Sequence, residues 1–202
     1  MPDSPADIIL QHHPDPFASQ REAAREYREQ HGSLGILPSY SEARELAVLV
    51  AAVRATYVCM LYSGFGYGAL HIASAFRLTG RLDVVESDPR AAEFAEKLVT
   101  QSAYNDRVRV NLGSHQNVVG SLNGPYDTIL LDDWGTKYLP LFNDLVRLTR
   151  TGGCIIVQRL GGNTIPESLG ESDSLLGAMV NDPRLYTSVP EALSPVIAVR
   201  LR

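Results

Sequence analysis

Two glycines and a carboxylate in the first half of the chain have the residue types and spacing of a nucleoside-binding site. Gly64, Gly66 and Ala69 fit the pattern G-x-G-x-x-G/A, and Glu86 follows about 20 residues later. Glycines let the backbone approach a ligand, and a carboxylate accepts hydrogen bonds from ribose hydroxyls. Because Glu86 ends an apolar run, where a carboxylate needs a partner, we favour a ribose contact. The glycines also suit a helix packed tightly on a strand, and this structural role stays open.

Several other kinds of active site are missing from the sequence. Lysine occurs only at Lys97 and Lys137, and neither has a tyrosine four positions before it, as a Tyr-x-x-x-Lys dehydrogenase would require. The sequence also has no GK[ST] phosphate loop, no H-E-x-x-H zinc motif and no G-x-S-x-G nucleophile turn. These absences disfavour hydrolases, kinases and zinc enzymes, and they leave an NAD(P)-binding oxidoreductase as a third alternative.

The composition indicates a protein that acts on small molecules. The chain has 202 residues, a formal charge of −5 and no cluster of basic residues, which argues against a nucleic-acid surface. No apolar run approaches the roughly 20 residues of a membrane-spanning helix. The N-terminal sequence, with its early acidic residues, does not read as a secretory signal. We therefore expect a cytoplasmic protein with neither a membrane nor a nucleic acid as its partner.

Strand-like and helix-like segments alternate along the middle of the chain. The apolar run TYVCMLY at 56–62 predicts a buried parallel strand before the glycine turn. Further strands are expected at 81–87, 107–112, 126–132 and 154–158. Helices are expected at 66–78, at 88–103, from 114 and at 137–149, and a turn at RTGG. Five repeats of strand and helix predict a doubly wound α/β fold, with helices on both faces and a ligand at the carboxyl ends of the strands.

The flanking segments complete a single domain over residues 1–202. Residues 1–16 contain four prolines and are expected to be mobile, and residues 17–53 are expected to form N-terminal helices. Residues 54–202 form the predicted Rossmann-like core. A helix at about 172–181 and two antiparallel strands near the C-terminus would complete a mainly parallel sheet of seven strands.

The chain resembles the S-adenosylmethionine-dependent O-methyltransferases of the catechol and caffeoyl-CoA type, in particular a small actinobacterial branch. The resemblance covers roughly residues 35–202. It rests on GILPSYSEARELAVLV, YSGFGYGAL, LDVVESDPRAAEFAEKLV, DRVRVNLGSHQNVV, YDTILLDDWGTKYL and TRTGGCIIVQR. It implies a class I methyltransferase fold, S-adenosylmethionine as cofactor, a small-molecule methyl acceptor and a homodimer. A catalytically silent descendant that serves as a binding or assembly protein is the main alternative.

The resemblance also implies a role for individual residues. It places Ser63, Gly64, Gly66, Tyr67 and Gly68 at the methionine end of the cofactor. It places Glu86 on the ribose, with Ser87 beside the adenine. Gly113, Ser114 and His115 stand where relatives approach the adenine ring, and Asp132 aligns with an acid that closes the site.

Two positions depart from the pattern at the cofactor's amino-acid end. An acid late in the first strand is replaced by Met60, and the first glycine of the turn is replaced by Tyr62. The loss of a charge-assisted hydrogen bond costs about 1.5–3 kcal/mol, so we expect weakened cofactor binding. Replacing Met60 by Glu and Tyr62 by Gly should then strengthen it. Ser114, in place of an acid, is a milder change.

The positions that bind a metal ion in metal-dependent relatives have also changed. Asp132 matches the first of these ligands, but Gln158 and Arg159 take the places of an Asp-Asn pair. A guanidinium repels a cation, so we expect no catalytic metal, and we hypothesise an ion pair between Asp132 and Arg159. The alternative, which the sequence supports equally, is an exposed arginine at a strand end.

Methyl transfer to a hydroxyl needs a group that removes the proton of the acceptor. Asp132 and Lys137 are our candidate catalytic residues, with Asp133 and His115 as further possibilities. His115 could instead be a wall of the cofactor pocket or an exposed helix start. Trp134 could cover an aromatic acceptor, or the edge of the sheet.

The two cysteines, Cys59 and Cys154, lie in apolar runs and are expected to be buried free thiols. With the strand order 3-2-1-4-5 that the resemblance implies, the fourth strand would lie between them. Their separation would then exceed the reach of a disulfide.

Overall fold

The computed structural model describes residues 12–32, 35–76, 79–133, 136–158, 174–190 and 195–202. Its centre is a seven-stranded sheet with the order β3-β2-β1-β4-β5-β7-β6. The strands are β1 (Tyr57–Met60), β2 (Arg81–Glu86), β3 (Val108–Leu112), β4 (Tyr126–Leu131), β5 (Thr149–Val157), β6 (Leu185–Ser188) and β7 (Val196–Arg200). The first five strands pair in parallel, and β7 runs antiparallel to both of its neighbours. The predicted doubly wound, mainly parallel sheet of seven strands with an antiparallel C-terminal strand is therefore confirmed.

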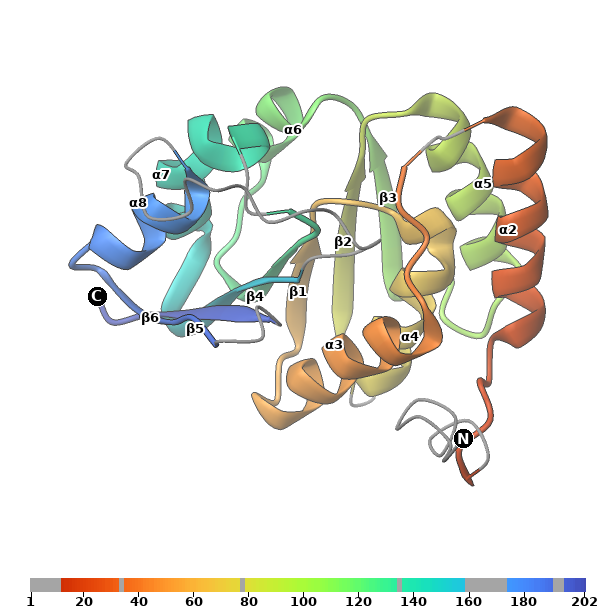
Figure 1. Ribbon diagram of the computed structural model, residues 1–202, viewed down its shortest axis with the longest axis horizontal. Helices are drawn as coiled ribbons and strands as arrows, with labels where there is room; N and C mark the ends of the chain where they lie inside the picture. The colour runs from red at the N-terminus through yellow and green to blue at the C-terminus, as the bar shows by residue number, and fades with distance from the viewer. Residues whose placement is uncertain (1–11, 33–34, 77–78, 134–135, 159–173, 191–194) are drawn as a thin grey trace, which may run out of the picture.

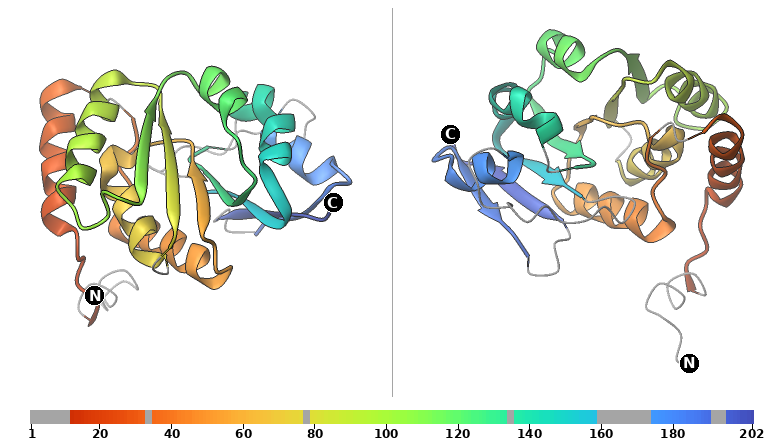
Figure 2. Two further views of the ribbon diagram at one scale, coloured as in Figure 1. Left: turned by 180° about the vertical axis from the view of Figure 1, so that it is seen from behind. Right: turned by 45° about the horizontal axis from the view of Figure 1, so that its top comes forward.

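Helices cover both faces of the sheet (Figures 1 and 2). The α-helices are α2 (Ala18–His31), α3 (Tyr40–Ala52), α4 (Tyr67–Ala75), α5 (Pro89–Thr100), α6 (His115–Ser121), α7 (Phe142–Leu148) and α8 (Leu175–Asn181). Helix α2 lies along α5, where the rings of Tyr27 and Phe94 pack in a tilted arrangement at a centroid distance of 4.5 Å. No helix of the described ranges is long and apolar enough to span a membrane.

Side chains that alternate along the strands build a separate core on each face. Met60 and Cys154 pack in the core beneath α3, α4 and α5, whereas Cys59 and Leu61 pack in the core beneath α6, α7 and α8. This period of two is the direct result of the pleated strand. Both cysteines are buried and free, as expected. They differ in strand and in face, which excludes a disulfide within the chain.

Local signals fix the helix starts that border the ligand end of the sheet. Ser39 caps α3, and its N–H in turn binds the Glu42 carboxylate in a complete capping box. Asp88 caps α5 through the N–H groups of Arg90 and Ala91, with Pro89 at the first helical position. The start of the helix expected at 88–103 is thus confirmed.

The prediction of one α-helix at 137–149 is wrong for its first half, which forms a 3₁₀ helix. Residues Thr136–Leu141 form a 3₁₀ helix, η2, which contains Pro140 and precedes α7. Proline lacks the N–H that a continuous α-helix would use. The expected turn at RTGG is also wrong, because these residues lie within β5, which is already paired at Thr149 and shifts register opposite β4.

The N-terminal segment is attached to the fold from His13 onward, where the carbonyl oxygen accepts a hydrogen bond from the Tyr40 hydroxyl (2.8 Å). The Asp15 carboxylate accepts hydrogen bonds from the Tyr67 hydroxyl (2.7 Å) and the Phe17 N–H (2.9 Å), and its side chain is only 7% exposed. Its Oδ1 also lies 3.3 Å from His71 Nε2. Residues 1–11 are outside the described ranges, so the mobility expected for 1–16 stays a prediction.

Candidate functional site

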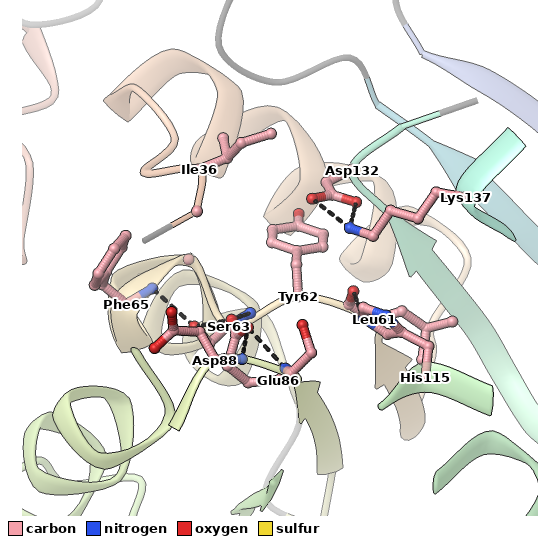
Figure 3. A pocket seen from close by; sticks show the side chains of 13 residues that line it. Ile36, Leu61, Tyr62, Ser63, Phe65, Glu86, Asp88, His115, Asp132 and Lys137 are labelled. Atoms are coloured by element: carbon pink, nitrogen blue, oxygen red, sulfur yellow. Dashed lines mark hydrogen bonds and ion pairs between the residues drawn. The ribbon is translucent and has the colours of Figure 1, made fainter. Parts of the chain in front are cut away.

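A cavity of about 270 Å³ lies at the carboxyl ends of β1, β2 and β4, where the strand order reverses on either side of β1 (Figure 3). It is lined by Gly35, Ile36, Leu61, Tyr62, Ser63, Gly64, Phe65, Glu86, Ser87, Asp88, His115, Asp132 and Lys137. The sequence predicted a ligand at this end of the sheet. Six of the residues that the resemblance singled out are therefore brought together with the candidate catalytic residue Lys137: Ser63, Gly64, Glu86, Ser87, His115 and Asp132.

Glu86 organises the floor of the cavity from the end of β2. Its Oε2 accepts hydrogen bonds from the Ser63 hydroxyl (2.6 Å) and the Ser63 N–H (3.1 Å). Its Oε1 accepts from the N–H groups of Ser87 (2.8 Å) and Asp88 (3.0 Å). A carboxylate has about four acceptor positions, and the chain itself uses them. A ribose bound here would have to share Oε2 with Ser63 or replace its hydroxyl.

The glycine turn is a short 3₁₀ helix, Gly64–Gly66, that leads directly into α4. Phe65 has φ of 54° and Gly66 has φ of 80°, so the chain reverses sharply here. A Cβ on Gly66 would lie 3.1 Å from backbone atoms of Ala95 in α5. Gly66 therefore permits close packing of the turn on α5, a structural role that differs from the packing of a helix on a strand that the sequence left open.

Tyr67, Gly68, Gly113 and Ser114 do not line the cavity in the structure. The Tyr67 hydroxyl points to Asp15, and Gly68 lies against Met60, whose Cε would be 3.0 Å from an added Cβ. The Ser114 hydroxyl accepts from the backbone N–H at position 117 and caps α6. Contacts of these residues with a cofactor stay predictions.

His115 is a buried wall of the cavity and not an exposed helix start. Burial, together with the nearby Lys137 ammonium, lowers its pKa. The ring is therefore neutral near pH 7, and because its Nε2 lies 2.9 Å from the Leu61 carbonyl oxygen, this nitrogen carries the proton. His115 thus fixes the backbone at the end of β1.

Asp132 and Lys137, the two candidate catalytic residues, are in direct contact. Lys137 Nζ lies 3.2 Å from Asp132 Oδ1 and 3.4 Å from Oδ2. The Tyr138 hydroxyl lies 2.5 Å from Asp132 Oδ1 and 2.7 Å from the Leu61 carbonyl oxygen. Element η2 supplies both partners, so its 3₁₀ geometry sets the position of the Asp132 carboxylate.

Met60 and Tyr62, the two residues that depart from the family pattern at the amino-acid end of the cofactor, have different surroundings. Met60 is fully buried and packs beneath the turn, outside the cavity lining. Tyr62 does line the cavity, with 5% of its surface exposed, and its hydroxyl has no hydrogen-bond partner among the described residues. Burial raises the pKa of Tyr62 well above its ordinary value, so the hydroxyl keeps its proton.

The described side chains at the ends of β4 and β5 are largely engaged with other residues of the chain, although the Gln158 amide oxygen has no hydrogen-bond partner among the described residues. Gln158 donates from Nε2 to Glu45 (2.7 Å), and the Asp132 carboxylate already holds an ammonium and a phenolic hydroxyl. Within the described ranges, no group of three or more His, Cys, Asp or Glu side chains could hold a metal. Trp134, Arg159 and the hypothesised Asp132–Arg159 pair lie outside these ranges.

Sequence reasoning missed three contributors to the site. Tyr138 and the Leu61 carbonyl form the hydrogen-bonded wall beside Asp132, and Asp88 adds a carboxylate to the cavity lining. The tyrosine could have been flagged by its place six residues after Asp132, near the start of the following helix-like segment. A carbonyl oxygen leaves no sequence signal at all.

Residues 21–164 match the family model described as O-methyltransferase. The chain belongs to this O-methyltransferase family. Among curated relatives, it is 26% identical over 133 residues to a catechol O-methyltransferase of Niastella koreensis, a match that covers 64% of this chain and 60% of that protein. It is also 26% identical over 136 residues to a catechol O-methyltransferase of Mycobacterium tuberculosis, covering 66% of this chain and 62% of that protein. The chain thus spans less than two thirds of either relative.

Solved structures of O-methyltransferases share the fold. The O-methyltransferase of Bacillus cereus in complex with SAH aligns with a TM-score of 0.74 at 18% identity, over 98% of this chain and 97% of that one. A cofactor-bound protein from MTB aligns with a TM-score of 0.78 at 23% identity, over 99% and 98% of the two chains. At these identities the likeness establishes the architecture.

Proposed function

We propose that this O-methyltransferase family member transfers a methyl group from S-adenosylmethionine to an oxygen of a small molecule, without a metal ion. The observation that carries the proposal is the cavity at the carboxyl ends of β1, β2 and β4, with the Glu86 carboxylate on its floor. Family membership and the SAH-bound Bacillus cereus structure of the same fold support it.

The charges of the cavity favour this ligand over a dinucleotide. Its described lining contains three carboxylates, Glu86, Asp88 and Asp132, and one ammonium, Lys137. An acidic cavity attracts a cationic sulfonium ligand and repels the pyrophosphate of NAD. The NAD(P)-dependent alternative loses support for this reason.

Each part of the cavity would hold a different part of the cofactor. Glu86 would bind the ribose, with Ser87 and His115 beside the adenine, and the turn from Ser63 to Gly64 would follow the methionine end. We propose that Gly66, Tyr67 and Gly68 act through the shape of this turn, and that Gly113 and Ser114 act through the start of α6.

The catalytic chemistry falls to the Asp132 and Lys137 pair. S-adenosylmethionine, when bound, supplies an electrophilic methyl group on its sulfonium. Asp132 would accept the proton of the acceptor hydroxyl as a general base. Lys137 would place a positive charge beside the oxygen that becomes anionic, and Tyr138 would hold the Asp132 carboxylate in position.

We also propose a cytoplasmic homodimer. The two free, buried thiols, Cys59 and Cys154, suit a reducing compartment. Val48 and Val53 are exposed apolar side chains on or just after α3, and such positions are candidates for a subunit contact. Light scattering coupled to size exclusion should give a mass near twice 22.1 kDa, and a monomer mass at micromolar concentration would contradict the dimer.

Titration calorimetry tests the proposed cofactor. S-adenosylmethionine and S-adenosylhomocysteine should both bind saturably, and NAD should not. If neither sulfur ligand produces heat or a thermal shift, the proposal is wrong. The catalytically silent binding or assembly protein would then be the better account, with the Tyr62 ring in the cavity as its supporting observation.

A further inference from the structure

A second cavity of about 250 Å³ lies between helices α3 and α4, which pack side by side (Figures 1 and 2). It shares no lining residue with the cavity at the strand ends. Its walls include Ala47, Val48 and Ala51 from α3 and Ala75 from α4. The three α3 positions are three or four residues apart and so lie on one face of the helix. The short alanine side chains leave the space between the two helices open.

Arg44 brings a positive charge to this α3–α4 cavity. Its Nη1 donates to the Tyr40 hydroxyl (2.7 Å), and its guanidinium carbon lies 5.9 Å from the centre of the Tyr40 ring. The Tyr40 hydroxyl in turn donates to the His13 carbonyl oxygen (2.8 Å). Among the described residues, no carboxylate forms an ion pair with Arg44. A guanidinium has five N–H donors, so most of them are available to a ligand.

His71 forms an uncharged wall of the same cavity. Its side chain is buried, and burial lowers its pKa, so the ring is neutral near pH 7. Asp15 lies beside this ring but does not line the cavity, and its oxygens accept from Tyr67 and from the Phe17 N–H. The described lining therefore carries the charge of Arg44 and no negative charge.

We propose that the α3–α4 cavity binds a small organic anion that has one carboxylate and an apolar body, as in an aliphatic or aromatic monocarboxylic acid. The carboxylate would pair with Arg44, and the apolar body would cover Val48 and Ala51. A cavity of roughly 150 Å³ already holds a benzene-sized molecule, so this one has room for the body and its carboxylate. The site is separate from the proposed cofactor cavity and does not depend on the proposed function.

The chemistry of the lining selects this class of ligand. A carboxylate matches the planar fork of a guanidinium and can accept two parallel hydrogen bonds from it. A second negative charge on the ligand would find no cationic partner among the described lining residues other than Arg44. A neutral apolar molecule would cover the alanines and leave the guanidinium without an acceptor. The cavity at the strand ends, with Glu86, Asp88 and Asp132 in its lining, repels the same anion.

The experiment uses 4-fluorobenzoate as the probe, because its fluorine NMR signal shifts and broadens when it binds. The full chain is titrated with the probe, with and without excess S-adenosylhomocysteine. We expect saturable binding with a dissociation constant of roughly 1 mM or below, unchanged by S-adenosylhomocysteine. The uncharged analogue 4-fluorobenzamide should bind about five-fold more weakly or worse, because it lacks the charge that Arg44 recognises.

Two pairs of variants locate the site. Arg44→Met should weaken probe binding about five-fold or more, whereas Arg54→Met, at an exposed arginine just after α3, should bind like wild type. Ala51→Leu fills the cavity and should have a similar effect. Ala52→Leu, at the adjacent exposed position outside the lining, is its matched control. The alanine pair decides the question even where loss of the Arg44 contact with Tyr40 disturbs the fold.

Four results would overturn the inference. The first is the absence of probe binding to wild-type protein at millimolar concentrations. The second is equal binding by Ala51→Leu and Ala52→Leu. The third is displacement of the probe by S-adenosylhomocysteine, which would place the carboxylate in the cavity at the strand ends. The fourth is probe binding that weakens as light scattering shows the chain assembling, which would assign Val48 and this cavity to a subunit contact.

Discussion

At the scale of single residues, Met60 lies beneath the glycine turn and outside the cavity. Its Cε occupies the space that a Cβ on Gly68 would need, so the methionine and the glycine fit one another. The sequence interpretation counted Met60 as a lost ligand of the cofactor. In the structure its side chain is a packing group, and the expected gain from replacing it no longer holds.

Met60→Glu should therefore destabilise the fold without strengthening cofactor binding. A carboxylate at this fully buried position would lie in an apolar cluster beside Gly64 and Gly68, and we expect a loss of about 2 kcal/mol or more in the free energy of unfolding. Urea unfolding measures the loss, and calorimetry with S-adenosylmethionine measures the affinity. A tighter complex would show that the side chain reaches the cavity after all.

Glu86→Gln should weaken S-adenosylmethionine binding at least ten-fold. The substitution removes the charge and places an amide NH₂ against the N–H groups that now donate to Glu86 from Ser63, Ser87 and Asp88. Calorimetry gives the affinity. Glu93→Gln, at an exposed position of α5, is the matched control and should bind like wild type, and equal affinities for the two variants would remove Glu86 from the site.

At the scale of elements, the segment before α2 is joined to the start of α4 by one carboxylate. Asp15 accepts from Tyr67 and lies beside His71, and both belong to the helix that follows the glycine turn. The N-terminal segment thus supports the turn from behind. Nothing in the sequence of the proline-rich N-terminus indicates this contact, because it depends on residues more than 50 positions apart.

Asp15→Ala should lower the free energy of unfolding by about 1–3 kcal/mol, because it leaves the buried Tyr67 hydroxyl without its acceptor. Tyr67→Phe should cost less, and the double variant should be no less stable than Asp15→Ala alone. Denaturant unfolding of the three variants completes a double-mutant cycle. Fully additive effects would mean that the two side chains do not interact.

Element types followed from the sequence where the pattern was local. The strand β1 was predicted from a continuous apolar run, and the start of α5 from Asp88 and Pro89. The 3₁₀ form of η2 was not predicted, because the residues around Pro140 follow a helical pattern that does not distinguish an α-helix from a 3₁₀ helix. This missed element matters for the site, because the geometry of η2 places Lys137 against Asp132.

The candidate site was predicted in outline and not in detail. Glu86, Ser63 and Asp132 stand at strand ends that the order of elements brings together, so the sequence could place them. The sequence could not predict which side chains point into the cavity. The Tyr67 hydroxyl points to Asp15, whereas Tyr62 lines the cavity, although the two tyrosines lie on either side of the same short turn.

At the scale of the whole molecule, two buried histidines make the stability depend on pH. Burial lowers the pKa of His71 despite its neighbour Asp15, and burial with Lys137 lowers the pKa of His115. The unfolded chain, with histidine pKa values near 6.5, then binds more protons than the folded chain in mildly acidic solution. Stability is fully present above about pH 6.5 and falls as the pH drops below that value.

Denaturant unfolding between pH 7.5 and 5 should show this decline, and His115→Gln should reduce its slope because one of the two histidines no longer takes up a proton. His31, exposed at the end of α2, provides the control as His31→Gln and should leave the slope unchanged. A free energy of unfolding that is flat or rising toward pH 5 would contradict the assignment of buried neutral histidines.

The alternation that sends Cys59 to one core and Cys154 to the other gives the protein a built-in pair of reporters. Each thiol is buried against a different helical layer, so a thiol reagent can reach it only when that layer opens. Labelling rates read by mass spectrometry would therefore time the opening of the two sides separately. Equal rates would mean that the sheet and both layers come apart as one unit, and unequal rates would identify the layer that opens first.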